Sequence, residues 1–140
     1  MQLADIVFSI AILIMSVVIH EVSHGLMADF LGDRTARDAG RLTLNPLAHI
    51  DRFGTLLLPL LLIVFRSPFL FAYAKPVPFN PYNLRNGRIG PALVGMAGPA
   101  SNIATAIVFG MLLRFFSSSG SLTELLAIVV YANLLLAVFN

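Results

Sequence analysis

Two histidines with a glutamate between them are the residues in this sequence best suited to chemistry. His20-Glu21-Val22-Ser23-His24 fits the H-E-x-x-H pattern. On a helix, residues i and i+4 share a face, so both imidazoles can reach one metal ion. Glu21 is offset around the helix, too far to bind the metal but near enough to accept a proton from a metal-activated water. The spacing predicts that His20 and His24 bind Zn²⁺ and that Glu21 is the general base of a hydrolase.

The histidine pair also has interpretations without a metal. His20 and His24 could tie two helices together, or they could relay protons in a small transporter. A transporter should show an internal repeat with interrupted helices at matching positions, and the sequence has no such repeat. Ionisable groups inside an apolar helix are costly and usually functional. The metal site is therefore the favoured interpretation.

The composition predicts that these residues lie in a membrane. Apolar residues make up 58% of the chain and charged residues 11%, against about 45–50% and about 25% in soluble domains. The net charge of +2 is small and the basic residues lie in loops, which argues against nucleic acid as a partner. With no cysteine, disulfides and thiolate zinc ligands are excluded.

Three apolar segments have the length of membrane spans. The first runs from Leu3 to about Leu31 and ends at Gly32, which gives about 43 Å of helix at 1.5 Å per residue, enough for the roughly 30 Å hydrocarbon core. The others are Pro91–Phe116 and Leu122–Asn140. We therefore expect an all-α polytopic membrane protein with three transmembrane helices, forming one membrane-embedded unit over residues 1–140.

A fourth apolar segment, Gly54–Ala74, is interrupted by Arg66-Ser67-Pro68. Each half is too short to span, and an arginine is poorly tolerated at mid-bilayer. We therefore expect a re-entrant hairpin that returns on the side from which it entered. Between the first two apolar segments, Arg41–Leu44 alternates in polarity, and both a short interfacial strand and a solvated loop remain open.

The basic residues predict an orientation for this topology. A returning hairpin leaves seven of the nine on one side of the membrane, with Arg66 and Arg114 elsewhere. A full crossing would largely remove this asymmetry. The positive-inside rule then places the N-terminus outside and the histidines near the cytoplasmic face. The seven are Arg34, Arg37, Arg41, Arg52, Lys75, Arg85 and Arg88.

Three further segments accompany the histidine pattern in a recognisable order. They are Asn45-Pro46-Leu47-Ala48-His49-Ile50-Asp51 with Gly54-Thr55, then Ala74-Lys75-Pro76-Val77-Pro78, then Gly98-Pro99-Ala100-Ser101-Asn102. Together with H-E-x-x-H they resemble the compact subgroup of the site-2 protease family of intramembrane metalloproteases. The last segment matches its G-P-x-x-N motif, and the resemblance covers most of the chain.

This resemblance implies a zinc metalloendopeptidase that hydrolyses peptide bonds within or near transmembrane helices of membrane-protein substrates in the lipid bilayer. It also implies that Asn102 lies near the zinc and donates a hydrogen bond to the oxyanion. The alternative for Asn102 is a hydrogen bond between helices, typically under about 1 kcal/mol.

The sequence departs from the family at the third zinc ligand. The family takes this ligand from an aspartate in an L-D-G motif that follows a phenylalanine-asparagine pair, whereas this sequence reaches Phe139-Asn140 and contains no L-D-G. We expect a truncated core that holds zinc weakly and is inactive or nearly so on its own, because catalytic sites normally supply three ligands. His49 or Asp51 could substitute, or could be ordinary loop residues. A non-catalytic membrane metal-binding or scaffold protein is the alternative function.

Overall fold

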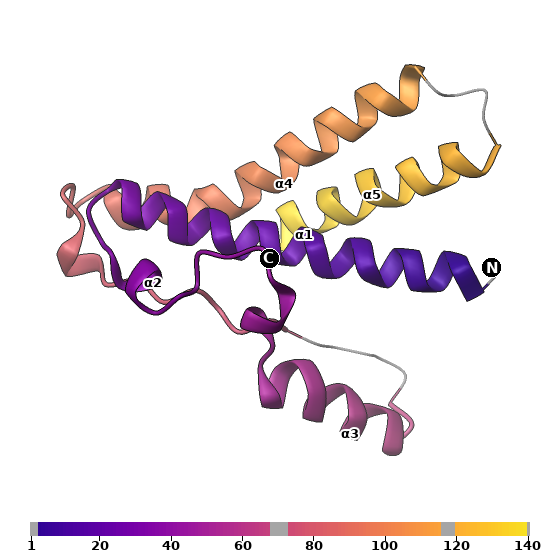
Figure 1. The fold of residues 1–140 in the computed structure, drawn as a ribbon, viewed down its shortest axis with the longest axis horizontal. Helices are drawn as coiled ribbons and strands as arrows, with labels where there is room; N and C mark the ends of the chain where they lie inside the picture. Colours follow the sequence, from indigo (N-terminus) through magenta and orange to yellow (C-terminus); the bar gives the residue numbers. More distant parts are fainter. Residues whose placement is uncertain (1–2, 68–72, 116–119, 140) are drawn as a thin grey trace.

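Three long helices form the body of the protein. The computed structural model describes residues 3–67, 73–115 and 120–139, and the secondary structure within them is entirely helical. Helix α1 (Leu3–Phe30) packs against α4 (Gly90–Phe115) and α5 (Gly120–Phe139), and α4 and α5 also pack together (Figure 1). Each contains a stretch long and apolar enough to cross a membrane. This confirms that the three segments expected to span are helices of sufficient length and apolarity, as in a multi-pass membrane protein.

Several polar side chains lie in the buried interior of this bundle, beside apolar ones such as Val18 and Val94. His20, Asn102 and Asn133 are at most 2% exposed, whereas large apolar side chains such as Ile10 and Ile107 face outward. The side-chain amide of Asn133 on α5 donates to the hydroxyl of Ser16 on α1 at 2.9 Å. This distribution suits a hydrocarbon solvent, in which polar groups must find their partners inside the protein.

Helix α1 ends where the sequence predicts. Gly32 has φ +108°, a conformation that favours glycine because it has no Cβ. The N–H of Gly32 donates to the carbonyl of Asp29 at 3.0 Å, and that of Asp33 donates to Ala28 at 2.9 Å. These two bonds form the Schellman arrangement that closes a helix C-terminus.

The carboxylate of Asp33 connects this helix end to a distant loop. Asp33 is fully buried and accepts hydrogen bonds from Thr35, from the N–H of Asn80 at 2.6 Å and from the side-chain amide of Asn83 at 3.0 Å. Burial alone would raise the pKa of Asp33, but these hydrogen bonds outweigh it and lower the pKa below its ordinary value. The N–H of Arg85 also donates to the carbonyl of Leu31 at 2.8 Å. The loop before α4 is thereby fixed at the end of α1.

The segment between residues 51 and 75 leaves the bundle and returns to its starting point. It contains η2 (Arg52–Leu57), a π-helical turn, and α3 (Leu58–Val64), which lies apart from the long helices (Figure 1). The N–H of Tyr73 donates to the carbonyl of Gly54 at 3.2 Å, so the two ends of the segment meet. Residues 68–72 of the expected hairpin lie outside the described residues, as do Phe116 of the second expected span and Asn140 of the third. Whether the segment enters a membrane stays a prediction.

The rest of the polar region is short helical turns and loop. Arg41–Leu44 forms no strand within the described part of the chain, which favours the loop alternative. The N–H of Arg41 donates to the carbonyl of Ala36 at 2.9 Å and its guanidinium donates to that of Lys75 at 2.8 Å. The polar groups of Arg41 thus bond to carbonyls of a turn and a loop, and not to a neighbouring strand. The remaining elements are α2 (Thr35–Asp38), η1 (Pro46–His49) and η3 (Pro81–Asn83).

Candidate metal centre

The imidazoles of His20 and His24 converge on one point between α1 and α4. They lie one turn apart on α1, and their Nε2 atoms are 3.0 Å from each other. The two rings are nearly perpendicular, with an interplanar angle of 82°. Two nitrogens bound tetrahedrally to zinc at about 2.0–2.1 Å would lie about 3.4 Å apart. A small increase in the distance between the two Nε2 atoms would therefore give the spacing of two zinc ligands.

A backbone carbonyl of α4 fixes the orientation of His24. Its Nδ1 lies 2.6 Å from the carbonyl oxygen of Val94. Since a carbonyl oxygen can only accept, Nδ1 carries the proton and donates. The Nε2 lone pair is then free for a metal, which is the usual arrangement of a metal-bound histidine.

The side chain of Asn102 contacts the other histidine. It is fully buried, and its Nδ2 lies 3.1 Å from Nδ1 of His20. Its Oδ1 is buried without a partner among the described residues. Because the two ends of an amide have nearly the same shape, a half-turn of the group brings Oδ1 to His20, where it accepts from Nδ1–H. In that orientation both histidines present a free Nε2 to the same point.

Gly98 leaves this point open. A Cβ built on Gly98 would lie 2.5 Å from Nε2 of His20 and would also overlap Nε2 of His24. Gly98 lies one turn after Val94 and one turn before Asn102, so three buried residues on one face of α4 complete the histidine pair. Glycine at this position leaves open the space beside both Nε2 atoms, which a metal ion could occupy.

The carboxylate of Glu21 faces the proline-rich loop. Its Oε2 accepts a hydrogen bond from the N–H of Val77 at 2.9 Å. Pro76 and Pro78 have no N–H, so Val77 is the one donor in this tripeptide. A Cβ on Gly25 would lie 2.7 Å from a Val77 methyl carbon, so glycine here permits the loop to pack closely on α1. The candidate general base thus lies between α1 and this loop.

Neither proposed substitute ligand reaches the histidine pair. Nε2 of His49 lies 2.9 Å from the carbonyl of Thr43. Oδ1 of Asp51 accepts from the N–H groups of Phe53 and Gly54 and caps η2. Within residues 3–67, 73–115 and 120–139 no group of three His, Cys, Asp or Glu side chains could hold a metal ion. The described residues therefore bring together two imidazole nitrogens that could bind a metal, and no third candidate ligand joins them.

Sequence reasoning placed His20, Glu21, His24 and Asn102, and the structure brings the two histidines and Asn102 together. It missed the contacts made by the carbonyl of Val94 and the N–H of Val77, and it included Gly98 in a motif without its role beside the histidines. Two signals were available: the i, i+4 spacing of Gly98 and Asn102, and a single donor between two prolines. A backbone carbonyl gives no signal in a sequence, because every residue has one.

The chain is similar to a protein of Bacillus subtilis (strain 168) named "Putative zinc metalloprotease YwhC". The two are 36% identical over 138 residues, which cover 91% of this chain and 59% of that protein. The chain thus spans less than two thirds of the length of the relative it matches. No protein-family model matches the chain. No solved structure matches it.

Proposed function

We propose that this chain is the core of a zinc metalloendopeptidase of the site-2 protease type, which cleaves peptide bonds within or near transmembrane helices of membrane-protein substrates. The observation that carries the proposal is the convergence of two Nε2 atoms on the space beside Gly98. The name of the Bacillus subtilis relative supports a zinc metalloprotease. The three apolar helices support substrates that are themselves in the bilayer.

Each residue of the site has a separate role in peptide hydrolysis. His20 and His24 hold the zinc, which when bound supplies Lewis-acid activation of water and of the scissile carbonyl. Glu21 accepts the proton of the attacking water and passes it to the leaving amine. Its present bond to the N–H of Val77 must weaken as it takes up that proton, since the protonated carboxyl is a poorer acceptor.

Asn102 can make a hydrogen bond between helices and can also donate to the oxyanion. With Oδ1 accepting from Nδ1–H of His20, its Nδ2 group is free to donate to the oxyanion of the tetrahedral intermediate. The contact with His20 and the buried Oδ1 without a partner support a role in orienting the His20 imidazole. The family resemblance supports the oxyanion role.

A third protein ligand is required for tight zinc binding, because catalytic zinc sites normally have three. We propose that it comes from outside the described residues, as the aspartate of the family would, and that the described chain alone is close to inactive. The competing function is a non-catalytic membrane metal-binding or scaffold protein. The absence of a third ligand within the described residues is the observation that favours it.

The mechanism is tested in the protein as the cell makes it, with a helical membrane substrate. Glu21→Gln should retain zinc and lose cleavage, whereas His20→Ala should lose both. Cleavage by Glu21→Gln at the wild-type rate would refute the assigned base. A wild-type protein that binds zinc and cleaves no helical substrate would support the scaffold function.

The topology is part of the same proposal: Gly54–Ala74 is re-entrant, the N-terminus is outside and the site lies near the cytoplasmic face. The bonds of Asp33 to Asn83 and of Arg85 to Leu31 support a hairpin, because they hold the loop after it at the end of α1. Single cysteines at Leu44 and Tyr82, both exposed, can be labelled in this cysteine-free chain. Labelling from opposite sides would refute the hairpin.

A further inference from the structure

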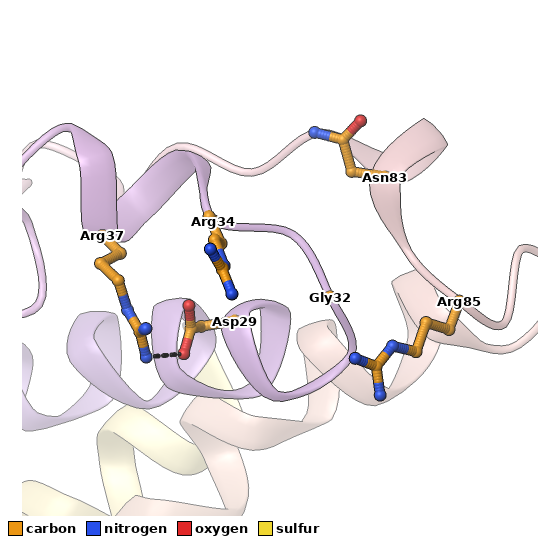
Figure 2. A pocket seen from close by; sticks show the side chains of 6 residues that line it. All are labelled: Asp29, Gly32, Arg34, Arg37, Asn83 and Arg85. Atoms are coloured by element: carbon orange, nitrogen blue, oxygen red, sulfur yellow. Dashed lines mark hydrogen bonds and ion pairs between the residues drawn. The ribbon is translucent and has the colours of Figure 1, made fainter.

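A cavity lined by three arginines lies at the end of α1, away from the histidine pair. We call it the arginine pocket, and its volume is about 470 Å³. Figure 2 shows Arg34 and Arg37 directed toward Asp29, while Arg85 reaches in from the loop before α4. The pocket is lined by Asp29, Gly32, Arg34, Arg37, Asn83 and Arg85.

Specific contacts bring these arginines together from distant parts of the chain. Arg34 directly follows Asp33, whose carboxylate holds Asn83. The N–H of Arg85 is bonded to the carbonyl of Leu31. The Arg85 side chain then lies over Gly32, where a Cβ would be 3.2 Å from its Cγ and 3.3 Å from its Nε. Absence of a side chain at Gly32 thus makes room for Arg85 in the pocket.

The pocket carries more positive than negative charge. One guanidinium, that of Arg37, pairs with the carboxylate of Asp29 at 2.5 Å. Among the residues that the structure describes, no acceptor contacts the guanidinium of Arg34 or of Arg85. Two positive charges therefore remain unneutralised in one hollow. Guanidinium groups match the geometry of phosphate oxygens and bind them bidentately.

The position of the pocket indicates where such a phosphate would come from. The stretch of α1 that is long and apolar enough to span a membrane ends at Phe30, which is 77% exposed. Asp29 and Gly32 lie on either side of that residue, so the pocket opens at the level where lipid headgroups begin. We propose that the arginine pocket binds the phosphate of an anionic phospholipid headgroup. The proposal depends on the three membrane spans and not on the proposed hydrolysis.

The test measures which lipids the 140-residue chain retains. The wild type is purified from bilayers of equal phosphatidylglycerol and phosphatidylcholine, and bound lipids are identified by native mass spectrometry. Because each of these guanidinium groups would make charge-assisted hydrogen bonds to the headgroup phosphate, Arg34→Ala with Arg85→Ala should lower the retained ratio of phosphatidylglycerol to phosphatidylcholine roughly tenfold. Arg52→Ala with Arg88→Ala is the control: it removes two exposed charges outside the pocket and should leave the ratio unchanged.

Three outcomes would overturn the proposal. If both double variants lose the same amount of phosphatidylglycerol, the arginines act only as a general surface charge. If neither variant changes the ratio, the pocket does not bind the lipid. The third outcome concerns thermal unfolding measured with added inorganic phosphate. If it raises the unfolding temperature of the wild type and not of the pocket variant, while lipid retention is equal in both, the ligand is free phosphate and not a headgroup.

Discussion

Replacing Gly98 with alanine is the sharpest test of the metal centre. The added methyl would lie 2.5 Å from Nε2 of His20 and overlap Nε2 of His24, in the space where the metal would be bound. The methyl cannot move away by rotation, because it is attached directly to the backbone of α4. Either the two imidazole rings must leave the positions in which both could bind one metal ion, or the two helices must separate.

The expected effect can be estimated from the contacts. Losing a supporting contact to a metal ligand typically costs about 10- to 100-fold in affinity. Filling the ligand space itself should cost at least about 100-fold, which is about 2.8 kcal/mol. Alanine is otherwise the better helix former, by about 0.5–1 kcal/mol. Gly98→Ala should therefore weaken metal binding much more than it disturbs the fold.

The assay is competition for Zn²⁺ against a chromophoric chelator in detergent micelles, with thermal unfolding of the metal-free protein as a second readout. Gly95→Ala is the matched control, because it lies on the same helix and a Cβ there would meet no atom within 4 Å. It should bind zinc as the wild type does. If Gly98→Ala keeps its fold and its zinc affinity stays within about twofold of the Gly95→Ala value, the metal site is not where we place it.

Three further outcomes follow from the same structure. Asn102→Ala should lower zinc affinity about 10- to 100-fold, whereas Asn102→Asp, which can still accept from Nδ1–H of His20, should retain most of it; equal losses in chelator competition would contradict the orienting role. Arg66 lies just after α3 with φ +50°, so Arg66→Gly should raise stability by about 1 kcal/mol in thermal unfolding, and a decrease would show that its side chain matters more than this strain. The pKa of Asp33 is lower in the folded protein than in the unfolded chain, where it is about 3.9, so the carboxylate stabilises the fold at pH values above that unfolded pKa. This stability is lost as the pH falls through the pKa of the folded protein. Unfolding measured between about pH 2 and pH 6 should show this loss, and Asp33→Asn should show a smaller one.

Local sequence features predicted the parts of the fold that local physics determines. The length and polarity of the apolar segments predicted three spans, and Gly32 predicted the end of α1. The spacing of His20 and His24 predicted that their side chains meet. Each of these depends on residues within a few turns of one another.

The missed contacts depend on how distant segments pack. The carbonyl of Val94 is 70 residues from His24, and the N–H of Val77 is 56 residues from Glu21. Nothing in a local pattern indicates which turn of α4 will lie opposite the histidines. His49 and Asp51 illustrate the converse: their residue types suit zinc, but the loop directs them to backbone partners nearby.

The hydrogen bond between Ser16 and Asn133 has a consequence for how the protein is made. The amide of Asn133 lies in the middle of an apolar helix, and its partner is on the first helix of the chain. During synthesis α1 reaches the membrane long before α5. The Ser16 hydroxyl therefore has no bond to Asn133 until α5 is inserted. An α5 that enters the bilayer without α1 keeps the bond from Nδ2 of Asn133 to the carbonyl of Val129 but lacks the bond to Ser16, and the lost bond costs free energy in hydrocarbon. Closure of the bundle is thereby coupled to the arrival of the last described helix, and a chain that lacks α1 should insert α5 poorly.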